Sequence, residues 1–252
     1  MRLDEALVAR GLAPSRSRAR DQVLRGCVSV EGRIETKPAR MVATSADIAV
    51  ADPAGEYVSR SALKLVAGLD AAGFDVAGCH ALDVGASTGG FTQVLLERGA
   101  AHVVALDVGS GQIAAPLRED ARVTVMEGVN AREVLPVHLP YAPDLVVADV
   151  SFISLKLVLP VVLGLAAAHA RAVVLFKPQF EVGREALGKG GIARDDAAAA
   201  AAFEAVGDLI LQLGWRIVAT CESPIAGGDG NRERLICARH ASAPAASTSP
   251  LS

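Results

Sequence analysis

The sequence predicts an α/β fold: a Rossmann-like, mostly parallel sheet with helices on both faces and a C-terminal antiparallel hairpin, plus a small α+β domain in front of it. From about Ser59 onward, short apolar runs of strand length alternate with segments of helical periodicity. This alternation is typical of a parallel sheet covered on both faces. Two strand-like runs, 216–221 and 234–238, then close the pattern as a hairpin. Residues 1–58 show neither feature, so we expect a separate domain there.

The N-terminal domain is expected to contain two helices and a short sheet. Apolar side chains recur at helical spacing within residues 1–25, and Gly11 and Gly26 stop the two helices. Segments 28–30 and 48–50 alternate apolar and polar residues, as strands do. Residues 10–16 (RGLAPSR), followed ten residues later by GCVSVEG, closely resemble the small S-four-like RNA-binding module of ribosomal proteins.

Charge is distributed unevenly between the two parts of the chain. The first 40 residues hold nine basic and five acidic side chains, a net of +4; because the whole chain carries −3, the remaining 212 residues carry −7. A basic module attached to an acidic body suits a nucleic-acid partner. The side chains expected to contact RNA are Arg16, Arg18, Arg20, Arg25, Arg33 and Lys37.

The larger domain, residues 59–240, is expected to follow the parallel-sheet pattern element by element. The predicted strands before the hairpin are 80–84, 102–108, 123–126, 145–148 and 172–176. The predicted helices are 62–72, one beginning at 92–97, 155–168, and a long alanine-rich helix that is capped by Asp195 or Asp196 and ends at Leu213. Residues 241–252 (ASAPAASTSPLS) are expected to be a disordered tail.

A glycine-rich turn, DVGASTGGF at residues 83–91, follows the first predicted strand and leads into a helix. Such a turn lets the backbone approach a ligand closely, and the helix N-terminus favours a carboxylate or phosphate. A dinucleotide would also fit, because Asp107 lies about 20 residues further on, where a ribose-binding acid is expected. An ATP-type phosphate loop is excluded, since G-K-[ST] is missing.

Three features favour S-adenosylmethionine over a dinucleotide. Asp83 stands where dehydrogenases usually have an apolar residue, and it can bind the cationic amino group of methionine. Ser87 replaces the middle glycine of G-x-G-x-x-G. Polar residues also follow the later strands, at the carboxyl edge where such ligands bind. The predicted cofactor-binding residues are Asp83, Gly85, Ala86, Ser87, Thr88, Gly89, Asp107, Glu127, Asn130 and Asp149.

A second group of charged residues is expected at the same edge. Lys177 follows an apolar strand in FKPQFE, where a buried ammonium is costly unless it is paired. Asp149, at the end of the adjacent strand in LVVADVSF, is its expected partner. Lys64 lies in the helix before the first strand, and Glu233 opens the final strand.

Six segments of the chain occur in a recognisable order and spacing: DVGASTGGF, LDVG, VADVSFISL, FKPQFEVGR, GKGGIAR and GNRE. In these segments the chain resembles the TlyA (hemolysin-A-like) ribosomal RNA 2′-O-methyltransferases, which are relatives of the FtsJ-type enzymes. The resemblance covers nearly the whole chain. The resemblance implies a class I methyltransferase fold and a catalytic Lys-Asp-Lys-Glu tetrad, here Lys64, Asp149, Lys177 and Glu233. Only the charged neighbours of Glu233, Arg232 and Arg234, depart from the expected pattern.

The implied reaction transfers a methyl group from S-adenosylmethionine to a ribose 2′-hydroxyl of cytidine in large-subunit ribosomal RNA; within the family, some members modify the large subunit alone and others modify both subunits. Lys177 would accept the hydroxyl proton in its neutral form. Phe152 and Phe180 either stack on a splayed base or pack in the core. The alternatives are a non-catalytic RNA-binding or ribosome-assembly factor, a hemolysin-type membrane-active protein, and a nicotinamide-dependent oxidoreductase.

Composition restricts the remaining possibilities. The four scattered cysteines show no metal-ligand spacing, so we expect reduced thiols and no bound metal. The longest uncharged stretch, 157–170, is shorter than the roughly 20 apolar residues of a membrane span. No signal peptide is recognisable at the N-terminus. We therefore expect a cytoplasmic protein, a monomer or weak dimer, whose partners are ribosomal RNA and ribosomal subunits.

Overall fold

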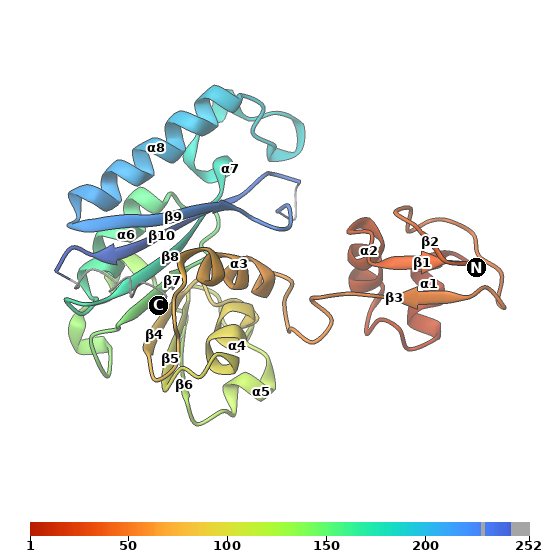
Figure 1. The fold of residues 1–252 in the computed structure, drawn as a ribbon, viewed down its shortest axis with the longest axis horizontal. Coiled ribbons are helices and arrows are strands. Elements are labelled where there is room, and N and C mark those ends of the chain that lie inside the picture. The colour runs from red at the N-terminus through yellow and green to blue at the C-terminus, as the bar shows by residue number, and fades with distance from the viewer. Residues whose placement is uncertain (228–229, 243–252) are drawn as a thin grey trace, which may run out of the picture. The chain divides into compact units, whose positions relative to one another are not determined.

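The structure is a computed structural model, and it describes residues 1–227 and 230–242. From residue 243 onward, the predicted tail lies outside the described residues. The chain forms two compact units, Met1–Glu56 and a second that begins at Tyr57 (Figure 1). Each unit has a hydrophobic core of its own.

The first unit packs two helices against a small antiparallel sheet. Its elements are α1 (Leu3–Ala9), α2 (Arg16–Leu24), β1 (Val28–Val30), β2 (Arg33–Ile34) and β3 (Ile48–Val50). The strands pair in the order β2-β1-β3, so the loop expected after Gly32 contains a further strand, β2. Ser15 begins α2 by accepting a hydrogen bond from the backbone N–H of Arg18. Leu3, Leu7 and Val23 meet Val28 in the core.

The second unit is built on a seven-stranded sheet, which confirms the predicted fold class. The strands run in the order β6-β5-β4-β7-β8-β10-β9; the first five are parallel, and β10 is antiparallel to both β8 and β9. They are β4 (His80–Val84), β5 (His102–Asp107), β6 (Val123–Glu127), β7 (Leu145–Ala148), β8 (Arg171–Phe176), β9 (Trp215–Glu222) and β10 (Arg234–His240).

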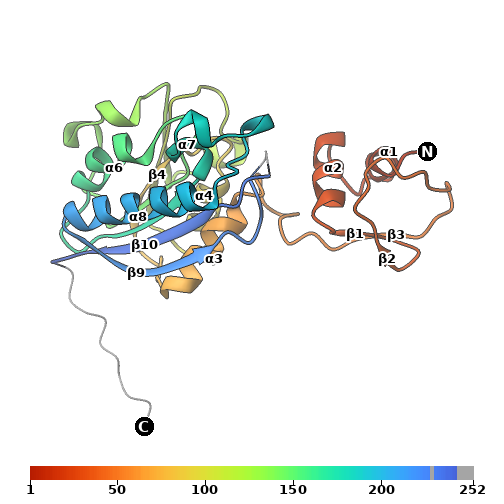
Figure 2. The ribbon, with the colours of Figure 1, turned by 90° about the horizontal axis from the view of Figure 1, so that it is seen from above.

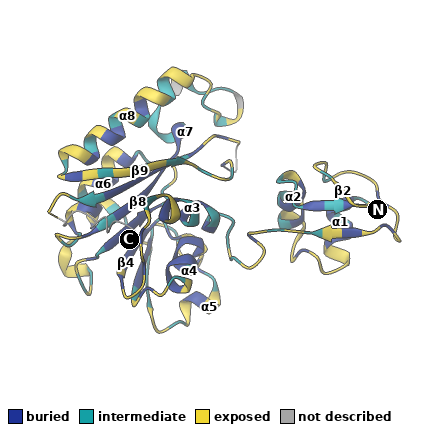
Figure 3. Ribbon diagram, viewed as in Figure 1, coloured by how far each residue is buried: buried dark blue, intermediate teal, exposed yellow. Residues whose placement is uncertain are grey.

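Helices cover both faces of this sheet (Figures 1 and 2). One face carries α3 (Ala62–Ala72) and α4 (Gly90–Glu97), and the other carries α6 (Leu155–Gly164) and α8 (Asp196–Gln212). Successive strand residues contribute to opposite cores: Ala81 packs with the first pair of helices and Leu82 with the second. The inner strands β4, β5, β7 and β8 are therefore mostly apolar and buried, and they lie in the buried centre of the unit in Figure 3.

Short elements connect the main ones near the carboxyl edge of the sheet. They are α5 (Ala115–Arg118), α7 (Pro178–Glu181) and four 3₁₀ turns, η1 (Ala131–Glu133), η2 (Pro136–His138), η3 (Arg184–Ala186) and η4 (Lys189–Gly191). The sequence analysis did not anticipate these elements. It also extended the helix at 155–168 too far, because the chain turns at Leu165 to enter β8.

The orientation of α3 differs from the prediction. The spacing of apolar residues in the sequence predicts that Leu63, Val66 and Leu69 face inward. Leu69 is fully buried as predicted, but Leu63 and Val66 are only half-buried, whereas Leu65 is fully buried. The reason is Gly68, which lies so close to the sheet that a Cβ there would collide with side chains of β8 and β10. Lys64 precedes Gly68 by four residues and shares its face, so the rotation turns Lys64 inward as well.

Two further statements concern the residues that the structure describes. None of their helices combines the length and apolar character that crossing a membrane requires. No group of three or more histidine, cysteine, aspartate or glutamate side chains among them is arranged to hold a metal ion.

Candidate active site

The turn after β4 is held tightly against the segment after β7. Gly85 and Gly89 have φ values of 84° and 99°, and Ser87 has 49°. A side chain at Gly85 would collide with the backbone carbonyl group of Asp149. The glycine therefore serves two purposes: it permits the left-handed turn, and it brings Asp149 next to the turn. Two sequence motifs more than 60 residues apart meet at this point.

Gly85→Ala is expected to destabilise the protein more than Gly78→Ala. Both glycines have positive φ, but a Cβ at Gly78 meets nothing within 4 Å, whereas one at Gly85 collides with backbone. Left-handed strain costs about 1–2 kcal/mol in each variant, and the collision adds to it only at Gly85. Urea denaturation measures both losses. Equal losses would show that residue 85 has room for a side chain.

Asp83 is buried beneath the turn. Its side chain is fully inaccessible, and Oδ2 accepts a hydrogen bond from Thr92 Oγ1 at 2.6 Å. Its other oxygen, Oδ1, has no hydrogen-bond partner among the described residues. Burial, reinforced by the nearby carboxylates of Asp149 and Asp107, raises the pKa of Asp83 to about 7, although the hydrogen bond from Thr92 opposes the rise. A buried carboxylate oxygen without a partner is suited to a cationic ligand group.

Two adjoining hollows open over the turn, and together we call them the cofactor hollow. The smaller has a volume of about 150 Å³ and reaches Lys177; the larger, about 570 Å³, extends past Asp107 and Asn130. The residues that line both parts are Gly85, Ser87, Asp149 and Ser151. The hollow therefore runs from the ion pair after β7 and β8 to the loops after β5 and β6. An elongated nucleoside with a charged end matches this shape.

Several residues predicted to bind the cofactor line this hollow. They are Gly85, Ala86, Ser87, Asp107, Asn130 and Asp149. Asp107 also organises the turn, because its carboxylate accepts hydrogen bonds from the backbone N–H groups of Ser87, at 2.8 Å, and Gly109, at 2.7 Å. Asp83 lies beneath the hollow rather than in its lining, and Thr88 and Gly89 are outside it.

Glu127 has a different environment from the one expected. It does not line the cofactor hollow. Its carboxylate accepts hydrogen bonds from the backbone N–H groups of Gln112 and Ile113 and pairs with Arg118 at 2.7 Å. These contacts lower the pKa of Glu127 to about 2, and the contact with Arg118 has the largest effect. Glu127 holds the loop that carries Gln112, which does line the hollow.

The first of two buried ion pairs joins Lys177 and Asp149. Lys177 Nζ lies 2.6 Å from Asp149 Oδ1 and donates a hydrogen bond to Ser151 Oγ at 2.8 Å. Both side chains follow neighbouring parallel strands, β8 and β7, so their proximity follows from the sheet order. Lys177 is 9% exposed and borders the smaller part of the cofactor hollow. Its ammonium is thus fixed in direction and still reachable from the hollow.

The second pair joins Lys64 of α3 to Glu233, the residue before β10. Their side chains form a buried salt bridge although they are 169 residues apart. Burial raises the pKa of Glu233, and the Lys64 ammonium opposes this rise. Lys177 and Asp149 also influence the pKa of Glu233, which indicates that the two pairs lie near one another. Two lysines and two carboxylates therefore make a cluster without net charge.

The structure adds residues that the sequence analysis did not single out. Asn231 is 2% exposed; its side chain accepts a hydrogen bond from Ala193 N and donates one to Gly191 O. It ties the GKGGIAR segment to the start of β10, next to Glu233. Its place in GNRE was a signal, but only the contacts give it a role. Ser151, the partner of Lys177, likewise lies in the quoted segment VADVSFISL, whereas Thr92, the partner of Asp83, carried no sequence signal of this kind.

The predicted RNA-contacting residues of the first unit differ in availability. Arg20, Arg33 and Lys37 are exposed. Arg16 is half exposed while it pairs with Asp4 and Glu5, and Arg18 donates a hydrogen bond to Ala54 O. Arg25 is engaged internally: its guanidinium forms two hydrogen bonds with Asp52, at 2.7 and 2.8 Å, and a third with Asp21.

Two known families match the chain. The FtsJ-like methyltransferase family matches residues 57–240, and the S4 domain family matches residues 1–48. The first match covers every residue of the buried pairs and of the cofactor hollow. The second covers all six basic residues expected to contact RNA.

Individual proteins resemble the chain over most of their length. The 16S/23S rRNA (cytidine-2′-O)-methyltransferase TlyA of Mycobacterium tuberculosis is 48% identical, over 94% of this chain and 89% of that protein. Hemolysin A of Brachyspira hyodysenteriae is 39% identical, over 93% and 98% respectively. A solved structure named "Putative hemolysin from Streptococcus thermophilus" is 36% identical, with a TM-score of 0.75 over 97% of this chain and 90% of that one.

Proposed function

The chain belongs to the FtsJ-like methyltransferase family, and from this premise we propose that it transfers a methyl group from S-adenosylmethionine to the ribose 2′-hydroxyl of a cytidine in ribosomal RNA. The observation that carries the proposal is the Lys177–Asp149 pair, which borders the cofactor hollow beside the glycine turn. Transfer of a methyl group to a hydroxyl requires a general base next to the cofactor site, and this arrangement provides one. The intact pairs also favour an enzyme over a non-catalytic RNA-binding factor.

The residues present fit S-adenosylmethionine. Asp83 lies beneath the turn with its Oδ1 buried and without a partner among the described residues, so it would bind the amino group of the methionine portion directly or through water. Asp107 and Asn130 line the larger part of the hollow, where hydroxyl and amino groups of an adenosine find acceptors. When bound, the cofactor supplies a methyl group activated by a positively charged sulfur.

The roles of the chain's own residues follow from their contacts. Lys177 in its neutral form would take the 2′-hydroxyl proton at Nζ as the oxygen attacks the methyl carbon, and Asp149 keeps Nζ in place. Ser151 fixes Nζ from a second direction. Lys64 and Glu233 would hold the ribose beside this base. Positioning of this kind can contribute about 7–11 kcal/mol to lowering a reaction barrier.

RNA would be bound by basic residues of the first unit and by an exposed aromatic side chain of the second. Arg20, Arg33 and Lys37 would contact phosphates, because these basic residues attract the negatively charged RNA that the acidic second unit repels. Phe152 is 92% exposed with a φ of 62°, and its ring lies 5.2 Å from that of Phe180. An exposed ring such as that of Phe152, beside the half-buried Phe180, is suited to stacking on a splayed target base.

The reaction can be tested with unmodified ribosomal RNA, ribosomal subunits and cofactor labelled in its methyl group. The RNA is digested to nucleosides, and we expect the label in 2′-O-methylcytidine. Replacing the mapped cytidine by 2′-deoxycytidine should abolish labelling, whereas the same replacement at a neighbouring nucleotide should not. Label on a base, or labelling of the deoxy substrate, would disprove the proposal. Comparing the two subunits identifies the target RNA.

Cofactor affinity is expected to fall as the pH is lowered from 7 to 5.5. The pKa of Asp83 is about 7 in the free protein, so below that pH the carboxyl is mostly protonated. An ammonium group prefers the ionised form, so binding releases a proton, and affinity should drop by about tenfold per pH unit well below the pKa. Calorimetry in buffers of different ionisation enthalpy measures this proton release directly. Affinity that does not change over this range would contradict the pairing of Asp83 with the amino group.

A further inference from the structure

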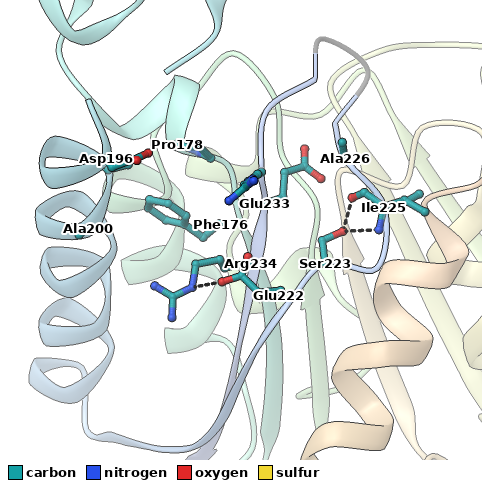
Figure 4. Close-up of a pocket in the computed structure, with 12 residues that line it drawn as sticks. Phe176, Pro178, Asp196, Ala200, Glu222, Ser223, Ile225, Ala226, Glu233 and Arg234 are labelled. Atoms are coloured by element: carbon teal, nitrogen blue, oxygen red, sulfur yellow. Dashed lines mark hydrogen bonds and ion pairs between the residues drawn. The ribbon is translucent and has the colours of Figure 1, made fainter. Parts of the chain in front are cut away.

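A second cavity, which we call the α8 cavity, borders Glu233 of the Lys64–Glu233 pair. Its volume is about 640 Å³. Ala200 of α8 forms one wall, Phe176 and Pro178 from the end of β8 form the back, and Ile225, Glu233 and Arg234 form the opposite wall (Figure 4). Specific ligand pockets commonly measure about 300–1,000 Å³.

The α8 cavity adjoins the reacting residues without being part of the cofactor site. It shares no lining residue with the cofactor hollow. Glu233 lines the cavity and is bonded to Lys64, while Pro178 lines it and directly follows Lys177. The proposed reaction centre therefore lies between two hollows, and only one of them is needed for the cofactor.

The lining favours a flat, uncharged group. Phe176, Pro178 and Ile225 supply apolar surface. The guanidinium of Arg234 lies 3.6 Å from the centroid of the Phe203 ring and forms an ion pair with Glu222 at 3.2 Å, two contacts that orient its plane. Nucleobases stack on apolar side chains and on guanidinium planes of this kind.

Charge argues against a phosphate in the same place. Arg234 is paired with Glu222, and Glu233 with Lys64. Of the remaining charged lining residues, one is basic and one acidic, namely Arg232 and Asp196. The cavity thus has no excess of positive charge to attract a phosphate, whereas a neutral base needs none.

We propose that the α8 cavity receives an unstacked nucleobase of the RNA, from a nucleotide adjacent to the one that is methylated. The inference rests on the proposed function and extends it to substrate recognition. The target nucleotide has its own stacking surface at Phe152, which lines the cofactor hollow and lies 5.2 Å from the Phe180 ring. A chain that places its ribose at Lys177 and continues past Glu233 brings its next base to the α8 cavity.

The test compares Ala200→Trp with Ala201→Trp. Both alanines are exposed on α8, so neither substitution threatens the core, but only Ala200 lines the α8 cavity. Ala200→Trp should raise the KM for ribosomal RNA by about tenfold, because stacking of one base contributes a factor of this order. The kcat at saturating RNA and the Kd for S-adenosylmethionine should stay as in the wild type. Ala201→Trp should change none of the three.

A fluorescent base distinguishes the two neighbours of the target. With 2-aminopurine placed on either side of the mapped cytidine, emission should rise on binding to the wild type at one of the two positions, and the rise should be absent with Ala200→Trp. Equal KM values for the two variants, or an altered cofactor Kd in Ala200→Trp, would overturn the proposal. Failure of the wild type to methylate ribose would instead disprove the proposed function, so the two failures are distinguishable.

Discussion

Lys177→Met is expected to lower the rate of methyl transfer by about 10³-fold, since a positioned base typically contributes 10²–10⁴. Methionine keeps the length and apolar stem of the side chain but removes the Nζ that contacts Asp149 and Ser151. The variant should still bind S-adenosylmethionine, because Asp83 and most of the cofactor hollow are untouched. Single-turnover methylation of ribosomal RNA with labelled cofactor measures the rate.

Lys156→Met is the matched control for this prediction. Lys156 is an exposed lysine of α6 that lines neither part of the cofactor hollow. We expect it to transfer methyl groups at the wild-type rate. A Lys177→Met enzyme with wild-type single-turnover rates would show that another group accepts the proton, and Asp149, at the same place, would be the first to examine.

The alternation of strands and helices could be predicted from the sequence because it follows from local patterns of apolar runs and helical periodicity. The full strand order was not predicted, and it departs from chain order because β7 pairs with β4 rather than with β6. Consecutive parallel strands are nevertheless often neighbours. The pairing of Asp149 with Lys177 follows from the same rule, since the two residues end the adjacent strands β7 and β8. Sequence patterns are informative when the contact they imply lies between neighbouring elements.

The salt bridge of Lys64 with Glu233 could not be predicted in this way. Its partners lie on α3 and before β10, 169 residues apart, and only the family resemblance placed them in one site. The orientation of α3 depends on how closely Gly68 approaches the sheet, a property of the packed structure rather than of helical periodicity. The predicted inward face was therefore right for Leu69 and wrong for Leu63 and Val66, although the helix itself was right.

Glu127 and Arg25 illustrate a second limit of sequence reasoning. Glu127 stands at a strand end where ligand-binding acids occur, and Arg25 lies in a basic segment suited to RNA. In the structure, Glu127 holds a loop through Arg118 and two backbone N–H groups, and Arg25 joins two carboxylates within the first unit. A charged residue in a segment of the expected kind can be engaged in ion pairs and hydrogen bonds within its own unit, and the sequence pattern does not show these contacts.

Lys64→Met is expected to lower the free energy of unfolding by about 3 kcal/mol, because removing one partner leaves the other buried and charged. The side chains of Lys64 and Glu233 are 8% and 2% exposed, so water cannot replace the lost partner. Burial already raises the pKa of Glu233, and without the lysine it should rise further. When the pKa of a carboxyl is raised in the folded state, the free energy of unfolding decreases as the pH increases through that pKa, because the carboxyl ionises more readily in the unfolded chain. The loss should therefore be larger at pH 8 than at pH 5, which urea denaturation at both values measures.

The double variant Lys64→Met/Glu233→Gln separates stability from catalysis. A neutral glutamine beside methionine removes the buried charge, so most of the lost stability should return, to within about 1 kcal/mol of the wild type. Methyl transfer should not return with it, because positioning of the ribose by two charged groups is lost. Recovery of both properties would mean that the pair supports the fold alone. Recovery of stability alone would mean that neutral residues can replace the two buried charges with little loss of stability. The charges would then be retained for the reaction rather than for the fold.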